Sequence, residues 1–110
     1  MLIYKIFRAA EWDQLCTDGE TVGAPIDVTD GYIHISTAEQ VVETAAKHFA
    51  GETDLHLIAL DSDALADDLK WEPSRGGALF PHLYRNLKMQ DVVWEKPLPL
   101  VDDAHQFPEL

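Results

Sequence analysis

The sequence predicts one α+β domain with a mixed or antiparallel sheet and two main helices. Its 110 residues suit a single domain, which is expected to span 1–110. Helix-like periodicity is concentrated in the first half of the chain and strand-like alternation in the second. This order is typical of α+β proteins and not of regular βαβ winding. Glycine-rich phosphate loops of the Rossmann or P-loop type do not occur.

The chain begins with alternating strand formers, and "LIYKIF" predicts a first strand over Leu2–Phe7. Residues 9–18 follow, with Trp12, Leu15 and Cys16 three and four positions apart. This spacing predicts a helix that buries the face carrying them. Cys16 is therefore expected to be a buried, inert thiol.

The next segment leads from turns into a strand and a second helix. Residues 20–31 are expected to hold turns and at most a short edge strand, because Pro25 is unsuited to a central one. Tyr32–Ser36 alternate and predict a strand that runs directly into the helix. Ser36 and Glu39 have the spacing of a capping box, in which each side chain bonds a free backbone N–H of the first turn.

The second helix is expected to end at Gly51 and to present one apolar face. That face consists of Val41, Val42, Ala45, Ala46 and Phe49. We expect it to pack on Leu57 and Ala59 of a central strand. Trp12 and Leu15 of the first helix are expected to pack inward above the same strand residues.

The second half of the chain predicts strands separated by turns. The segments with strand-like composition are 54–61, 69–73, 79–84 and 90–98. Residues 62–69 predict a short helix or a turn, and residues 74–78 predict a loop. Residues 101–110 are expected to form an acidic C-terminal tail.

Charge and cysteine content narrow the functional classes. Twenty acidic residues against eight basic ones give a net charge of −12, which repels phosphate backbones, so a nucleic-acid partner is not expected. The single cysteine excludes an internal disulfide and fits a reducing cytoplasm. Apolar runs are too short for a membrane span, so no membrane association is expected.

The strand-like stretch "YIHIS" carries the most unusual side chains of the chain. Ile33 and Ile35 alternate with Tyr32, His34 and Ser36, so the opposite face carries a phenol, an imidazole and a hydroxyl. We expect these three to face a partly solvated pocket, since buried polar groups without partners are costly. The neighbouring helix start would favour an anionic ligand there.

A second group of candidates lies near residue 80. In an extended segment, His82 and Tyr84 share a face. Arg75 lies in a glycine-containing loop just upstream, and Glu72 is the carboxylate nearest to it in sequence. Thr37, beside Ser36, completes the expected ligand-binding set. Histidines at metal-ligand spacing are absent, so no metal is expected.

Several motifs together resemble one small bacterial family, the domain of unknown function 952. The motifs are "IYKI", "DGYIHIST" followed by "AEQVVETAAKHF", "WEP" and "FPHLY", and they occur in order across nearly the whole chain. This family carries no established activity, so the resemblance implies a fold without implying a reaction.

A more distant resemblance concerns the RNA 2′-phosphotransferase branch of the ADP-ribosyltransferase superfamily. It implies a split α+β sheet that holds NAD, with site positions at Lys5, at His34 with Ser36, and near His82. Lys5 stands where the related pattern has histidine, and a late transferase glutamate is not visible.

We consider three functional hypotheses, of which the first follows from this resemblance. The first is NAD-dependent transfer, or hydrolysis at the nicotinamide ribose, in a histidine-lined nucleotide pocket. His34 would bind a ribose hydroxyl, His82 would clamp the ligand or act as general acid–base, and Tyr32 or Tyr84 would stack on a ring. The second is a ligand-binding module without catalysis, with a small nucleotide-like molecule as partner. The third is a metal-dependent hydrolase that uses His34 and His82.

Overall fold

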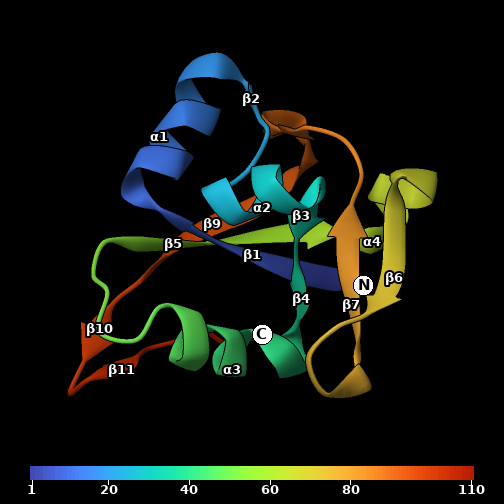
Figure 1. The fold of residues 1–110 in the computed structure, drawn as a ribbon. Helices are drawn as coiled ribbons and strands as arrows, with labels where there is room; N and C mark the ends of the chain where they lie inside the picture. The colour runs from blue at the N-terminus through green and yellow to red at the C-terminus, as the bar shows by residue number, and fades with distance from the viewer.

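The larger sheet of the structure has the strand order β4–β1–β5–β9, with every pair antiparallel (Figure 1). The computed structural model describes residues 1–110 apart from the side chain of Arg75. β1 (Leu2–Arg8) pairs with β5 (Leu55–Asp61) along its whole length, and β9 (Val92–Leu98) pairs with the other side of β5. β4 (Ser36–Thr37) meets β1 at two positions alone, opposite Ile3 and Tyr4.

A second antiparallel sheet has the order β3–β7–β6. It contains β3 (Ile33–His34), β7 (Leu79–Leu83) and β6 (Leu69–Pro73). The strand predicted over Tyr32–Ser36 is therefore wrong in one respect, because its two halves belong to different sheets. Ile35 lies at the crossing and donates its backbone N–H to Pro81 O at 3.1 Å.

Two short strand pairs complete the β structure. β2 (Glu20–Thr21) pairs with β8 (Leu87–Lys88), and β10 (Leu100–Val101) pairs with β11 (Ala104–His105). Both β11 and Phe107 lie within the segment expected as an acidic tail, and Phe107 packs on one of the two cores. The antiparallel alternative of the predicted α+β class is thus confirmed, since every described strand pair is antiparallel.

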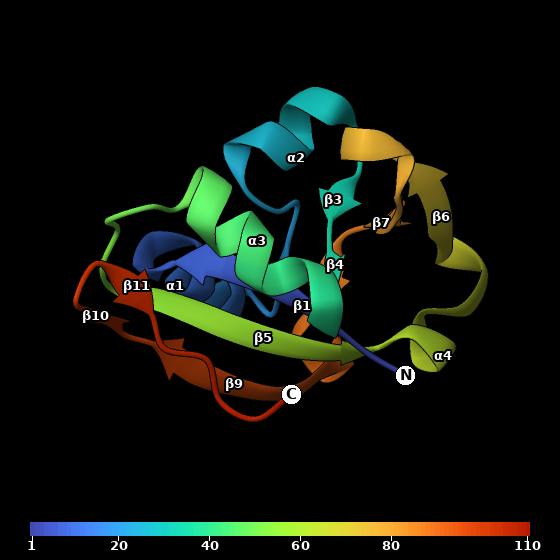
Figure 2. The ribbon, with the colours of Figure 1, turned by 90° about the horizontal axis from the view of Figure 1, so that it is seen from below.

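The two expected helices are α1 (Ala9–Asp18) and α3 (Ala38–His48), and Figure 2 shows α3 lying along β1 and β5. The predicted cap of α3 is wrong by one residue. Thr37, not Ser36, caps the helix, because its Oγ1 accepts from Gln40 N while its own N–H donates to Gln40 Oε1. The helix ends at His48, earlier than Gly51.

Short helical segments occupy several of the expected turns. α2 (Pro25–Asp30) replaces the turn that we expected over residues 20–31, and α4 (Ser62–Leu65) begins the segment expected as a short helix or turn. Single 3₁₀ turns lie at Ala66–Asp68, Arg75–Gly77 and Met89–Asp91. Proline suits the first turn of a helix because its missing N–H has no partner there in any case, which explains why α2 begins at Pro25.

The larger sheet has a hydrophobic core on each face. On one face, α3 covers a cluster that includes Leu57 and Ala59. On the other face, α1 and the second sheet cover a cluster that includes Leu15 and Leu83. The expectation that Trp12 and Leu15 pack above Leu57 and Ala59 is therefore wrong, because alternate residues of β5 point to opposite faces.

Three further burial predictions are wrong, and the helical phase explains them. Val42 is 51% exposed and Ala46 is also exposed, whereas Val41 and Ala45 are buried, so the apolar stripe of α3 is narrower than the sequence suggested. Cys16 is exposed, because Leu15 takes the inward position of α1.

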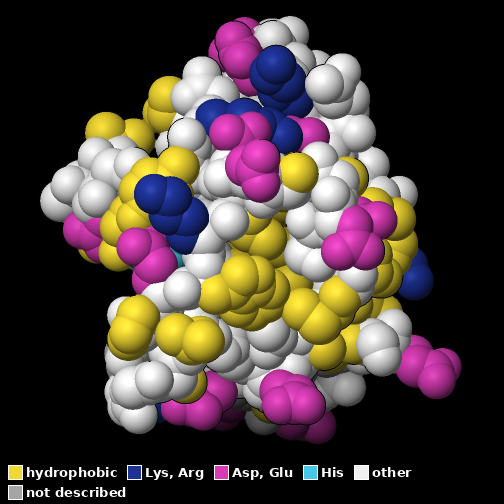
Figure 3. Space-filling model, turned by 90° about the vertical axis from the view of Figure 1, so that its right-hand side faces the viewer, with side chains coloured by type: hydrophobic (Ala, Val, Ile, Leu, Met, Phe, Trp, Pro, Cys, Tyr) yellow, Lys and Arg dark blue, Asp and Glu magenta, His cyan; other side chains and the backbone are white. Residues whose placement is uncertain are grey.

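The surface carries charges of both signs. On the face drawn in Figure 3, basic side chains lie among acidic ones, and apolar side chains cross its middle. Among the described residues, no helix combines the length and the apolar character that crossing a bilayer requires.

Candidate functional site

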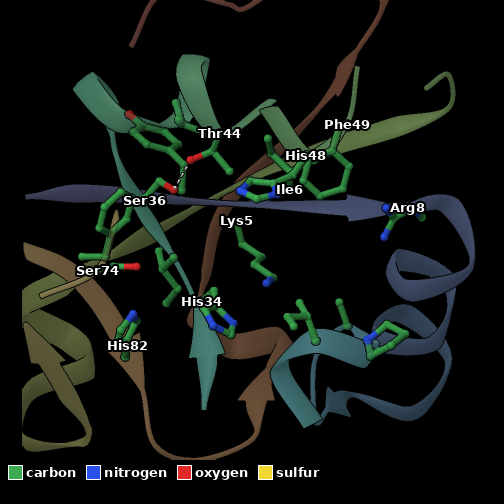
Figure 4. A pocket seen from close by; sticks show the side chains of 17 residues that line it. Lys5, Ile6, Arg8, His34, Ser36, Thr44, His48, Phe49, Ser74 and His82 are labelled. Carbon is green, nitrogen blue, oxygen red and sulfur yellow. Dashed lines mark hydrogen bonds between the residues drawn. The ribbon is translucent and has the colours of Figure 1, made fainter. Parts of the chain in front are cut away.

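A cavity of about 590 Å³ lies where the two sheets separate (Figure 4). It is lined by residues of β1, β4 and α3 on one side and by residues of α2, β3, β7 and the turn after β6 on the other. Four residues predicted for the site line it: Lys5, His34, Ser36 and His82. These four residues come from segments far apart in the sequence, and they line one cavity as we expected.

The cavity exists because β4 pairs with only the first part of β1. β5 continues alongside β1 as far as Arg8, but the β4 partners end at Tyr4. From Lys5 to Arg8, the β1 edge that faces away from β5 has no partner in β4 and borders the cavity. After His34, the chain crosses from the second sheet to the larger one, and Ile35 and Ser36 line the cavity at this crossing.

Asp27 is the hub of the polar groups beside the cavity. Its Oδ2 lies 2.8 Å from Lys5 Nζ and accepts from Ala24 N at 2.7 Å. Its Oδ1 accepts from His34 N at 3.0 Å and lies 2.6 Å from His34 Nδ1. The Asp27 side chain is fully buried, and the Lys5 side chain is 7% exposed. One carboxylate therefore fixes both the lysine and the histidine.

The groups that donate hydrogen bonds to Asp27 keep its carboxyl group ionised. Burial acts to raise the pKa of Asp27, but the hydrogen bond from His34 and the nearby Lys5 ammonium outweigh it and lower the pKa to about 2. Burial lowers the pKa of Lys5, and Asp27 opposes this change. Gly23 belongs to the same arrangement, since a Cβ at this position would overlap Asp27 Oδ2.

His34 is held from both sides. Nδ1 faces Asp27, and Nε2 lies 3.0 Å from Asp30 Oδ2. Both ring nitrogens therefore contact carboxylates, so proton abstraction by His34 would first require the loss of one of these contacts. The arrangement suits an orienting or hydrogen-bonding role better than that of a general base.

His82 has a different environment. It lies opposite His34 in the β3–β7 pair, and the two ring centroids are 5.5 Å apart. Its Nδ1 lies 2.9 Å from Glu72 Oε1, which also accepts from Tyr84 OH at 2.6 Å. The Tyr84 and His82 contacts lower the pKa of Glu72, and the bond to Glu72 raises the pKa of Tyr84 to about 12. A carboxylate thus orients His82 and leaves Nε2 for other contacts.

The two tyrosines lie behind the histidines instead of in the main cavity. Tyr32 stacks on His82 with centroids 4.1 Å apart, and its centroid is 5.3 Å from that of Tyr84. Both tyrosines line a smaller cavity of about 320 Å³. The expectation that Tyr32 faces the same pocket as His34 and Ser36 is therefore wrong. Tyr32 follows Gly31 outside β3 and does not continue its alternation.

The other predicted site residues differ in how they relate to the cavity. Ser36 lines the cavity with its Oγ 3.2 Å from Thr44 Oγ1, whereas Thr37 is engaged in capping α3. Glu72 supports His82 and does not line the cavity. The prediction for the Arg75 side chain lies outside the described part of the structure.

Sequence reasoning missed Asp27, Arg8 and the phenyl rings of Phe49 and Phe80, although all but Asp27 line the cavity. A signal for Asp27 existed, because Pro25 followed by an acid two residues later is typical of a helical first turn. Phe80 lies two residues before His82 in the same extended segment and therefore shares its face, whereas Arg8 and Phe49 had no comparable signal. In the described structure, no group of three or more His, Cys, Asp or Glu side chains is arranged to hold a metal ion.

Fold and site together define a small α+β domain with two antiparallel sheets and a polar cavity at their junction. The chain belongs to the family described as protein of unknown function DUF952, which matches residues 6–95. No curated protein matches it.

Solved structures of one related protein share this fold. The crystal structure of protein CC0527 from Caulobacter crescentus is 50% identical, with a TM-score of 0.93 over 96% of this chain and 94% of that one. A double mutant of CC0527 gives a TM-score of 0.92 at 48% identity, with the same coverage. The solution structure of CC0527 gives 0.85 at 50% identity, over 94% and 90% of the two chains.

Proposed function

We propose that the cavity binds an anionic nucleotide of the NAD class, in a domain of ADP-ribosyltransferase type. The observation that carries this proposal is the charge of the lining. Two cations, Lys5 and Arg8, and three histidines line the cavity, while none of its described lining side chains is Asp or Glu. Lys5 and Arg8 each pair with a carboxylate, but their remaining N–H groups can still donate to a small anion, in a chain whose net charge of −12 otherwise repels anions.

The shape of the cavity supports a ligand with two ring systems. Figure 4 shows Lys5 between Ser74 and His82 on one side and Phe49 on the other. Phe80 lies on β7, two residues before His82. If the phosphates of the ligand lie near Lys5, one ring system of the ligand could contact Phe49 and the other could contact Phe80. The volume of about 590 Å³ lies within the range of roughly 300–1,000 Å³ that small-molecule sites have.

The open edge of β1 offers backbone groups to the same ligand. In an antiparallel sheet, alternate residues direct both N–H and C=O to the same side. Beyond Tyr4, the groups that point away from β5 have no partner in β4. A carboxamide, which carries one acceptor and one donor group, matches such an edge. The resemblance to the ADP-ribosyltransferase superfamily assigns the nicotinamide–ribose part to this strand.

A second candidate function is turnover of the bound ligand, and the Glu72–His82 pair favours it. In hydrolysis, the bond between the nicotinamide nitrogen and the ribose carbon breaks, and the oxygen of water bonds to that carbon. His82 Nε2 would accept the proton that water releases and pass it to solvent. Binding without turnover is the alternative, and the lack of Asp and Glu among the described lining side chains favours it.

Calorimetric titration with NAD tests the binding proposal, and chromatography of released nicotinamide tests turnover. We expect saturable binding that Lys5→Met weakens by about tenfold or more, the scale of a charged hydrogen bond. Lys47→Met is the matched control, because Lys47 is exposed and pairs with Glu43 on α3 outside the cavity. Each variant is first compared with the unmodified protein by circular dichroism.

His82→Gln separates the two candidate functions. If the protein is an enzyme, this variant keeps NAD affinity and loses nicotinamide release. Saturable binding without any release in the unmodified protein would identify a binding module. A lack of saturable NAD binding in the unmodified protein would overturn the proposal.

A further inference from the structure

Arg8 is the second cation of the cavity, and it is held differently from Lys5. Its Nε and Nη2 donate to the two carboxylate oxygens of Glu52 at 2.8 and 3.0 Å, and its guanidinium lies 4.8 Å from the centre of the Phe49 ring. Figure 4 shows Arg8 at one end of the cavity, beyond Phe49. A cation therefore lies at each of two separate points along the cavity.

The two ion pairs differ in burial. Lys5 and Asp27 are 7% and 0% exposed, whereas Arg8 and Glu52 are 45% and 36% exposed. Breaking a buried pair leaves an uncompensated charge and is costly. An exposed pair contributes little to stability, because water replaces either partner. Arg8 can therefore exchange Glu52 for another anion, whereas Lys5 keeps Asp27.

Glu52 is positioned by its backbone, independently of Arg8. Its N–H donates to Phe49 O at 3.0 Å, and its carbonyl oxygen lies 2.9 Å from His105 Nε2 of β11. The hydrogen bond to Arg8 lowers the pKa of Glu52, and the same contact raises the pKa of Arg8. The backbone contacts thus keep Glu52 close to Arg8 even when the Arg8 side chain turns away.

We propose that Arg8 is a specificity-determining residue that binds a phosphate group of the ligand, and that Glu52 competes with the ligand for it. The inference rests on the proposed function in one respect, namely that the ligand occupies this cavity. The ligand class is a small molecule with a phosphate or diphosphate group, because the planar guanidinium binds two oxygens of such a group at once. Glu52 then disfavours ligands that lack this group, since they cannot replace its carboxylate.

Inorganic pyrophosphate is the probe, and the NMR signal of Arg8 Nε–H is the readout. We expect pyrophosphate to shift this signal, and Glu52→Gln to tighten pyrophosphate binding by roughly two- to fivefold, because an exposed competitor is lost. Arg8→Lys keeps the charge without the fork and should weaken binding, and Arg8→Gln should weaken it further, by about tenfold. Glu20→Gln is the matched control, because Glu20 lies on β2 outside the cavity and its change alters the net charge equally.

The outcomes separate this inference from the proposed function. A pyrophosphate titration that leaves the Arg8 signal unmoved in both the unmodified protein and Glu52→Gln would overturn the inference. Equal tightening by Glu20→Gln would also overturn it, because a general charge effect would then suffice. If pyrophosphate shifts Arg8 but NAD does not bind, the inference stands and the proposed function fails. If NAD binds equally to the unmodified protein and to Arg8→Gln, the inference alone fails.

Discussion

Lys5 Nζ and Asp27 Oδ2 lie 2.8 Å apart in a buried ion pair between β1 and the short helix α2. Asp27 also binds His34, so this carboxylate joins three segments of the chain. Removing one partner of a buried pair leaves the other charge without compensation, which is more costly than losing the attraction alone. The stability of the protein and the geometry of the candidate site therefore depend on the same side chain.

The first prediction concerns acid stability. The pKa of Asp27 is about 2 in the folded protein and about 3.8 ordinarily, a difference that corresponds to roughly 2 kcal/mol. Because the folded-state pKa is lowered, this contribution is fully present above pH 3.8 or so and is lost as the pH falls toward 2. Urea unfolding at a series of pH values should show the loss.

Asp27→Asn provides the test of that assignment. It should destabilise the protein by about 3–5 kcal/mol at neutral pH and flatten the acid dependence. Asp30→Asn is the control, because Asp30 also contacts His34 but is 38% exposed, so it should cost less than about 1 kcal/mol. An unchanged acid dependence in Asp27→Asn would contradict the prediction.

The second prediction compares two glycines with similar positive φ angles. Gly23 and Gly31 have φ of +98° and +86°, so alanine is strained at both. Alanine at 31 meets nothing within 4 Å and should cost about 1–2 kcal/mol from the backbone alone. Alanine at 23 would displace the Asp27 carboxylate and should cost clearly more. Equal losses in thermal unfolding would show that Asp27 can move without penalty.

The third prediction concerns the support of His82. Tyr84 has a pKa raised to about 12 by its hydrogen bond to Glu72. Glu72→Gln removes the carboxylate, so the Tyr84 pKa should fall toward its usual value near 10. An NMR titration of the Tyr84 ring signals measures it, with Glu95→Gln as a control on the distant β9 strand. A Tyr84 pKa that does not respond would contradict the Glu72 contact.

The fourth prediction uses adjacent valines of α3. Val41 is fully buried, whereas Val42 is 51% exposed. Val41→Ala should cost about 1–3 kcal/mol through lost burial and a small cavity, and Val42→Ala less than about 0.5 kcal/mol. Denaturant unfolding of the two variants measures both losses of unfolding free energy. A larger loss for Val42→Ala than for Val41→Ala would mean that the helix is rotated.

The regular elements could be predicted because their periodicity is local. β1, β5, α1 and α3 follow patterns that lie within one segment, and their centres agree with the sequence. The rotation of α3 about its axis was harder to predict, because Val41 and Val42 both fit an apolar stripe. The packing of the helix on the sheet decides which of the two valines is buried.

The candidate site could be predicted only in part. His34 and His82 were found because imidazoles in apolar, strand-like segments are unusual, and the structure places them opposite each other. Asp27 was missed because an acid in a turn-rich segment is normally exposed. Its burial depends on Lys5 and His34, which are brought to it by tertiary structure that no local pattern encodes.

The crossing at Ile35 has a consequence for how the cavity can change its width. β3 and β4 belong to different sheets, and only Ile35 separates them, with its N–H bonded to Pro81 O. A linker of one residue, buried at 2% exposure, cannot lengthen or swing freely. The two sheets on either side of the cavity are therefore joined by a short, buried connection, which limits how far they can move apart at this point.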